Sequence, residues 1–136
     1  MPSLRTWNVS LVVPLAIVAV GGTVYANHRF AELDIRHRAE ALTGGNPDRE
    51  RALFIAKGCG ACHSIEGVAQ ANGLVGPPLT GIAERSIIAG TLANNPANLQ
   101  QWISAPHSVL PGNAMPDIPM TAAETRDIAA FLYTRT

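Results

Sequence analysis

The N-terminal part of the chain begins with a long apolar run. No charged residue stands between Val9 and Ala26, and Val, Leu, Ile and Ala dominate this stretch. Its length is close to the lower limit of the roughly 17 to 25 residues that a helix needs to cross a bilayer. The residues that end at Ala26 also resemble a small-residue cleavage signal. We therefore expect residues 1–26 to form a single apolar helix that is retained as a membrane anchor or removed near Ala26.

A polar connector follows this run. Residues 27–45 mix acidic and basic side chains at helical spacing, and the cluster Thr43-Gly44-Gly45-Asn46 is typical of a helix end. We expect a separate domain over residues 46–136. Asn46 suits a helix cap and Pro47 suits the first helical position, so the pattern predicts a helix from there to about Lys57, with Gly58 as its stop.

Two further helices are predicted by their caps and apolar faces. Asn95 and Pro96 begin the first, which ends before Pro106. Thr121 and Glu124 form a capping box for the second, at the end of the chain. Apolar residues recur at helical spacing in both helices: Leu99, Trp102 and Ile103 in the first, and Ile128, Phe131 and Leu132 in the second. Residues 81–90, which carry three isoleucines, predict one more short helix.

The fold class that these elements predict is all-α. Long loops rich in Gly and Pro separate the short helices, although the domain is small. A chain of this size can hardly build a sufficient core from its own side chains, and a large apolar cofactor would give the helices something to pack around.

Net charge narrows the classes of partner. The chain carries 10 basic and 10 acidic residues, and beyond residue 45 the acids number seven and the bases six. This balance argues against nucleic acid as a partner and against strong electrostatic steering.

The chemistry of the chain centres on the run Cys59-Gly60-Ala61-Cys62-His63. This C-x-x-C-H spacing allows two thiols to attach to the two vinyl groups of one haem while the histidine supplies an iron ligand. The two cysteines are also the only ones in the chain. We therefore expect one covalently bound haem c, attached through Cys59 and Cys62, with His63 as an axial ligand.

A cysteine pair at this spacing can also serve in a zinc site or as a redox-active dithiol. A zinc site needs four nitrogen or sulfur ligands, and the sequence has no second cysteine pair. A thioredoxin-like dithiol usually lies where a strand enters a helix, and no strand-like alternation flanks Cys59. Both uses remain alternatives that the sequence disfavours.

The second axial ligand decides what the iron can do. Met115 is our candidate because Pro and Gly on both sides of the loop 111–116 favour a stiff presentation of one side chain. A thioether opposite an imidazole favours electron transfer over binding of exogenous ligands. Met120 and His107 are the competitors, but Met120 also suits the apolar contact before the last helix, and His107 suits a solvated loop.

Taken in order, these motifs resemble a class I cytochrome c. The resemblance rests on C-G-A-C-H at 59–63, G-P-P-L at 76–79, N-A-M-P at 113–116 and I-A-A-F-L at 128–132. More narrowly, G-P-P-L-T-G-I-A, N-L-Q-Q-W-I and P-G-N-A-M-P are similar to the cytochrome c domains fused to or associated with subunit II of bacterial haem-copper oxidases.

This resemblance implies a role for several more residues. It implies that the carbonyl of Pro77 accepts a hydrogen bond from the ring N–H of His63 and that Leu79 packs on the haem face. It also implies that Met115 is the distal ligand, while Arg85 and Trp102 resemble residues that donate hydrogen bonds to the haem propionates. Trp102 could equally well be a simple core residue, and Arg85 could equally well be a solvated surface charge.

The function that we expect is one-electron transfer without a small organic substrate. The partners would be a quinol-oxidising complex and a terminal oxidase, with the haem domain on the periplasmic face of a bacterial membrane, or free in the periplasm after cleavage. A haem-based sensor or peroxidase-like protein with a displaceable distal ligand is the alternative. A subunit in which haem only stabilises the fold is a third interpretation.

Overall fold

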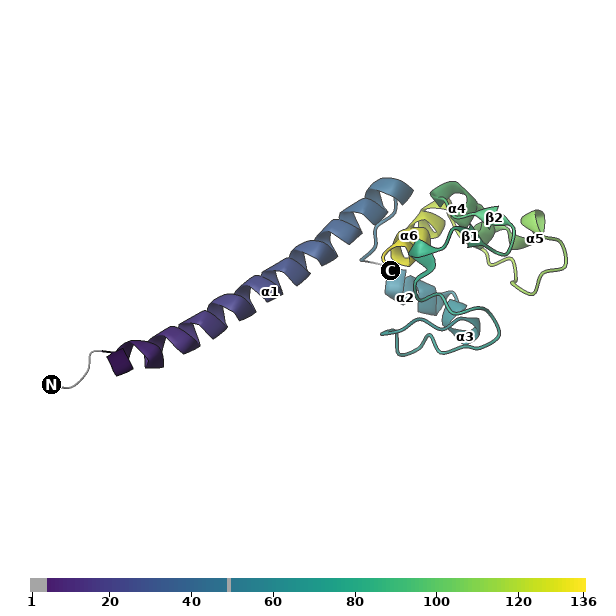
Figure 1. Ribbon diagram of the computed structural model, residues 1–136. Helices are drawn as coiled ribbons and strands as arrows, with labels where there is room; N and C mark the ends of the chain where they lie inside the picture. Colours follow the sequence, from purple (N-terminus) through teal and green to yellow (C-terminus); the bar gives the residue numbers. More distant parts are fainter. Residues whose placement is uncertain (1–4, 49) are drawn as a thin grey trace. The chain divides into compact units, whose positions relative to one another are not determined.

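The computed structural model describes residues 5–48 and 50–136. The first element, α1 (Arg5–Thr43), is a single helix of 39 residues (Figure 1). It runs through the predicted boundary at residue 26 and ends at the predicted breaker cluster, where Gly44 has a φ of +67°. Residues up to 34 form one compact unit and Ile35–Thr136 form the other, so the second unit begins before the boundary near Asn46 that the breaker cluster predicts.

The predicted membrane-spanning helix is not supported. Among the residues that the structure describes, no helix offers a stretch long and apolar enough to cross a bilayer. The aliphatic run is followed by Gly21, Gly22 and Thr23, which dilute its apolar side chains. Residues 1–4 of the predicted segment lie outside the described part of the chain.

The helix predicted from Pro47 starts later than expected. Helix α2 spans Glu50–Ala56. The side chain of Asn46 accepts a hydrogen bond from the amide of Asp48 at 2.8 Å, so it closes a turn ahead of the helix. The predicted end is confirmed, because Gly58 has a φ of +79° and donates to the carbonyl of Ile55. One further turn of helix, α3 (Cys59–Cys62), follows at once.

The prediction of a helix over residues 81–90 is largely wrong. Only the short 3-10 turn η1 (Ile82–Glu84) is helical, and the antiparallel strands β1 (Ile87–Ile88) and β2 (Leu92–Ala93) follow it. Ala89 and Gly90 both have positive φ, at 52° and 71°, which allows the chain to reverse within a few residues. β-branched isoleucines suit this paired, half-exposed hairpin better than a helix.

The remaining two predicted helices are confirmed. Helix α4 (Pro96–Ser104) is capped by Asn95, whose side chain accepts from the amide of Asn98 at 2.9 Å. Helix α6 (Ala122–Tyr133) begins with the predicted capping box between Thr121 and Glu124. An unpredicted turn, α5 (Pro106–Val109), lies between them because Pro106 both ends one helix and starts the next.

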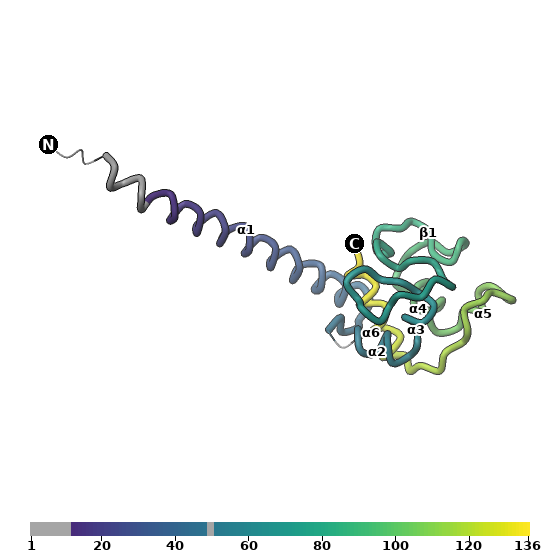
Figure 2. The backbone as a smooth tube through the Cα atoms, turned by 90° about the horizontal axis from the view of Figure 1, so that it is seen from below, coloured from purple at the N-terminus to yellow at the C-terminus, as the bar shows by residue number. Residues whose placement is uncertain are grey.

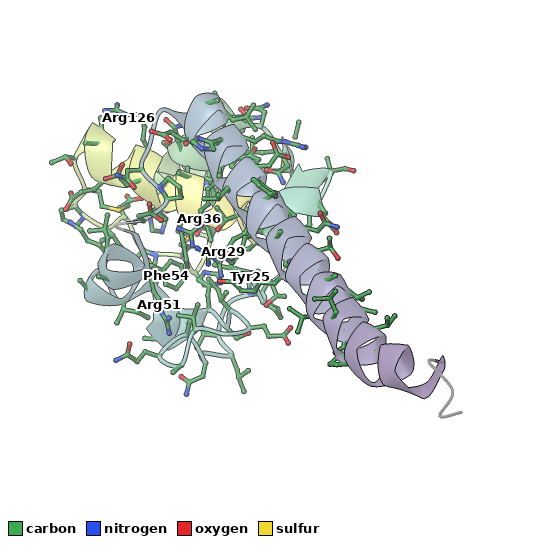
Figure 3. The ribbon with its side chains drawn as sticks, turned by 90° about the vertical axis from the view of Figure 1, so that its left-hand side faces the viewer. Tyr25, Arg29, Arg36, Arg51, Phe54 and Arg126 are labelled. Carbon is green, nitrogen blue, oxygen red and sulfur yellow. The ribbon has the colours of Figure 1, made fainter. Side chains whose placement is uncertain are left out.

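Helix α6 provides the centre of the core of the second unit. It packs against both α2 and α4, as the tube view also shows (Figure 2). Phe54 of α2 meets Phe131 of α6 with ring centroids 5.6 Å apart and planes tilted by 51°. The positions of Phe54 and Arg51 on α2 and of Arg126 on α6 can be followed in Figure 3. The turn α3, which carries both cysteines, contacts α2 and thereby lies next to this crossing.

Candidate functional site

A single cavity of about 530 Å³ collects all the residues that the sequence singled out as the candidate site. Its walls come from α2 and α3, the loop that follows them, the β1–β2 hairpin, α4, the loop 110–118 and α6. The predicted site residues among its lining are Cys59, Cys62, His63, Pro77, Leu79, Arg85, Trp102 and Met115. Segments far apart in the sequence therefore meet around one space.

The two cysteines lie three positions apart on α3, so both thiols face one side of its single turn. Both side chains are half-buried and neither forms a disulfide. Burial is the largest influence on Cys59 and raises the pKa of its thiol. The backbone at 70–73 presses closely on this turn, because a Cβ on Gly60 would lie 2.4 Å from the carbonyl oxygen of Gln70.

His63 is held in one orientation by the loop that follows it. Its Nδ1 lies 2.8 Å from the carbonyl oxygen of Pro77, as the resemblance implies. Because a carbonyl can only accept, Nδ1 carries a proton, and in the neutral ring this leaves a free lone pair on Nε2. The loop itself is fixed by two backbone bonds, from Gly76 to Cys62 and from Leu79 to Ser64, each 2.8 Å long.

Gly76 is a site residue to which the sequence reasoning gave no role. A Cβ at this position would lie 2.3 Å from Cε1 and 2.6 Å from Nδ1 of His63. The imidazole ring therefore occupies space that only a glycine leaves open. The signal was present in the sequence as the glycine that precedes the Pro77-Pro78 pair.

Of the three candidates for the second ligand, only Met115 lines the cavity. Its amide donates to the side chain of Asn113 at 2.8 Å, and the same asparagine donates to the carbonyl of Leu110. Met120 instead packs against the hydrophobic core. His107 is exposed and lies 3.2 Å from a carboxylate oxygen of Asp117. The fold thus separates three residues that lie close together in the sequence.

The remaining predicted residues line the cavity in different ways. Leu79 is buried at 8% exposure. Arg85 donates to the carbonyls of Pro78 and Thr80 at 2.5 and 3.2 Å, so its guanidinium already braces the loop beside Pro77. Trp102 is half-buried on α4. Their predicted contacts with haem propionates stay predictions.

The donor set of the cavity fits a covalently bound haem. Two thiols, one imidazole with a free Nε2 and one thioether face a space whose other lining is mostly apolar. The ring of His63 sits where a Cβ on Gly76 would otherwise lie, and this fixes the nitrogen ligand in place. Within the described residues, no three His, Cys, Asp or Glu side chains gather as a metal-binding group.

Comparison with known proteins identifies a cytochrome c domain over most of the second unit. The cytochrome c family model matches residues 49–136. The chain is similar to cytochrome c oxidase subunit 2 of Alkalihalophilus pseudofirmus, with 39% identity over 83 residues, which cover 60% of this chain and 23% of that protein. The same subunit from Bacillus sp. strain PS3 is 35% identical over 69 residues, covering 49% of this chain and 19% of that protein.

The third relative is cytochrome c oxidase subunit 2 of Bacillus subtilis, 34% identical over 65 residues, which cover 46% of this chain and 18% of the relative. The chain therefore spans less than a quarter of the length of these relatives. No solved structure matches the chain significantly. The family match over residues 49–136 and the donor set of the cavity agree, and the chain belongs to the cytochrome c family.

Proposed function

We propose that this protein passes single electrons to, or within, a membrane-bound terminal oxidase. Membership of the cytochrome c family implies electron transfer. One observation carries the proposal: His63, Met115 and both cysteines line the same cavity, as a six-coordinate electron-transfer site requires. Support for the oxidase comes from the three relatives, each named as subunit 2 of a cytochrome c oxidase.

A haem attached to Cys59 and Cys62 would supply a one-electron couple between ferrous and ferric iron. The residues of the chain set the conditions for that couple. The hydrogen bond between His63 and Pro77 holds the tautomer that can bind a metal through Nε2 and makes this nitrogen more basic. The thioether of Met115 would be a soft ligand to the haem iron, which would raise the reduction potential and close the site to small molecules.

The apolar wall of the cavity excludes water from the site. Ile82, Ile88 and Leu99 line it and are each at most 5% exposed. A dry, preformed site reorganises little when its charge changes by one unit, because few solvent dipoles must turn. Little reorganisation suits an electron carrier better than an enzyme that binds and releases substrates.

The mouth of the cavity is suited to docking with a protein partner. Val75, Ile87 and Leu110 line the cavity although they are 77%, 52% and 43% exposed, and Leu74, which precedes Val75 in the chain, is 89% exposed. Among the described residues that line the cavity, Arg85 alone is a Lys, Arg, Asp or Glu. Such a rim relies on apolar contact more than on charge attraction. We expect the rate of electron transfer with the partner to vary little with ionic strength.

Replacement of Met115 tests the electron-transfer site. We expect Met115→Ala to abolish the sulfur-to-iron absorption band of the ferric protein and to lower the reduction potential, because the soft axial ligand is lost. Met120→Ala is the matched control and should keep the band, since Met120 packs in the core. An unchanged spectrum in Met115→Ala would show that the ligand is another residue. Tight binding of carbon monoxide by the ferrous wild type would favour the sensor function instead.

The partner is tested by rapid mixing. The reduced protein should be oxidised by a terminal oxidase that is solubilised from membranes of the source organism. The oxidised protein should be reduced by the quinol-oxidising complex from those membranes. Absence of both reactions would contradict the proposal and favour a subunit in which haem only stabilises the fold.

We also propose that the haem domain works outside the cytoplasm, on the periplasmic face of the membrane or free in the periplasm. Support comes from the C-x-x-C-H motif, whose haem attachment requires export of the chain. Intact mass spectrometry of the mature protein distinguishes retention of the N-terminal segment from cleavage near Ala26, and the same mass reports whether one haem is attached. Membrane fractionation of the retained form then tests anchoring.

A further inference from the structure

The segment that carries Met115 has little backbone support of its own. Within the described part of the chain, residues 114–120 take part in no backbone-to-backbone hydrogen bond. Side chains hold the segment instead. Asn113 fixes the amide of Met115 at its start, and the carboxylate of Asp117 accepts from the amide of His107 at 3.3 Å and pairs with its ring. Its far end, before α6, needs a third support.

Lys57, which directly follows α2, supplies that support. Its Nζ donates to the carbonyl oxygen of Pro119 at 3.1 Å and pairs with Oε1 of Glu124 at 2.8 Å. The other oxygen of Glu124 accepts from the amide of Thr121 at 2.7 Å, within the capping box of α6. The side chains of Lys57 and Glu124 are 22% and 30% exposed, so solvent screens this pair only in part.

The position of Lys57 in the chain makes this contact relevant to the site. Lys57 follows α2 directly and stands two residues before Cys59, whereas Pro119 stands four residues after Met115. One ammonium group therefore connects the segment that carries the haem thiols to the segment that carries the candidate sulfur ligand. A hydrogen bond from a charged donor is stronger than one between neutral groups.

We propose that Lys57 is a positioning residue that keeps Met115 in the cavity by tying the carbonyl of Pro119 and the start of α6 to the end of α2. This proposal rests on the proposed function for the identity of the sulfur ligand. The side chain of Lys57 bonds to the carbonyl of Pro119 and the carboxylate of Glu124, so it acts on Met115 through the segment 116–120 and the start of α6.

The test measures how often the methionine leaves its site in the intact, haem-loaded protein. Imidazole added to the ferric protein competes for the position of the methionine sulfur, and its binding rate reports the opening of the segment. We expect Lys57→Met to bind imidazole about five- to tenfold faster, the size of effect that follows from losing one ordinary hydrogen bond, since solvent partly screens the charge of Lys57. Lys57→Arg keeps a charged donor and should restore most of the wild-type rate.

A matched control separates positioning from general stability. Arg36→Met removes the ion pair between Arg36 and Asp48, which joins the end of α1 to the turn before α2. It should leave the imidazole rate unchanged. Equal rates in Lys57→Met and the wild type would overturn the proposal, and so would equal acceleration in Arg36→Met.

A second measurement keeps this proposal distinct from the assignment of the ligand. Amide hydrogen exchange of Met115 and Thr121, whose amides donate to the side chains of Asn113 and Glu124, should be faster in the haem-loaded Lys57→Met protein than in the wild type, whichever residue binds the iron. If the wild type lacks the sulfur-to-iron band but exchange still accelerates, the ligand assignment fails and the role of Lys57 stands. Unchanged exchange overturns the role of Lys57.

Discussion

At the scale of single residues, glycines shape the site as strictly as its reactive side chains do. Gly76 leaves room for the ring of His63, and Gly60 and Gly73 allow the loop at 70–73 to press against the turn of α3. A Cβ on Gly73 would lie 2.3 Å from the carbonyl oxygen of Ala61. These distances are too short for any heavier side chain, so the backbone around the C-x-x-C-H turn depends on glycine.

We predict that Gly76→Ala disturbs His63 directly. The added methyl group would displace the imidazole and break its 2.8 Å hydrogen bond to Pro77. Overpacking of this kind lowers the free energy of unfolding by about 1–3 kcal/mol. Denaturant unfolding of both proteins measures the loss, and the absorption spectrum reports the disturbed ligand. Gly22→Ala in α1 is the control, since nothing lies within 4 Å of the added Cβ. Equal stability of Gly76→Ala and wild type would contradict the prediction.

At the scale of elements, the caps decide where helices begin, and one cap is also a pH-sensitive contact. Glu124 accepts hydrogen bonds from Lys57 and from the amide of Thr121, and these contacts hold the pKa of its carboxyl below the ordinary value of 4.5. Because the pKa is lower in the folded state, the ionised carboxylate stabilises the fold fully at pH values above the pKa of the unfolded state. This stabilisation is lost as the pH falls through the folded pKa.

We predict a pH-dependent effect of Glu124→Gln. At pH 7 the variant should be less stable than the wild type, and the difference should shrink as the pH falls below about 4.5, where the unfolded carboxyl takes up its proton. Denaturant titrations at a series of pH values measure this difference. Glu84→Gln, at an exposed position in η1, is the control. A difference that stays constant from neutral to acidic pH would show that the charge of Glu124 does not contribute.

At the scale of the whole molecule, the haem-binding unit includes the last turns of α1. Ala39 and Thr43 are only 1% and 4% exposed, and the carbonyl of Thr43 accepts from the side chain of Gln100 at 3.2 Å. The backbone at Gly45 approaches α6 so closely that a Cβ there would lie 2.2 Å from the carbonyl oxygen of Arg126. The end of α1 is therefore part of the fold that supports the cavity.

We predict that a fragment over residues 35–136 is more stable than one over residues 46–136. Removing 35–45 exposes the surface that Ala39 and Thr43 cover and leaves the amide of Gln100 without its acceptor. The cost is roughly 1–3 kcal/mol in the free energy of unfolding. Denaturant unfolding of the two haem-loaded fragments checks this difference. Equal stability would place the boundary near Asn46, where the breaker cluster predicts it.

Features that depend only on neighbouring residues could be predicted from the amino-acid sequence. The C-x-x-C-H run predicts covalent haem without any knowledge of the fold, because attachment needs only that spacing. The caps at Asn95 and Thr121 lie where their side chains predict, since a cap satisfies backbone groups within its own turn. The helix stop at Gly58 also depends only on adjacent residues, and each motif behind the family resemblance is a short run of adjacent residues.

Features that depend on segments far apart in the chain became known only from the folded structure. Local patterns could not predict that residues 87–93 pair as a hairpin, that a glycine makes room for the ring of His63, or that Lys57 reaches the carbonyl of Pro119. They also favoured a membrane-spanning helix that the described residues do not support. The physical reason is that packing and hydrogen bonding between distant segments override local preference, and their partners are known only once the chain has folded.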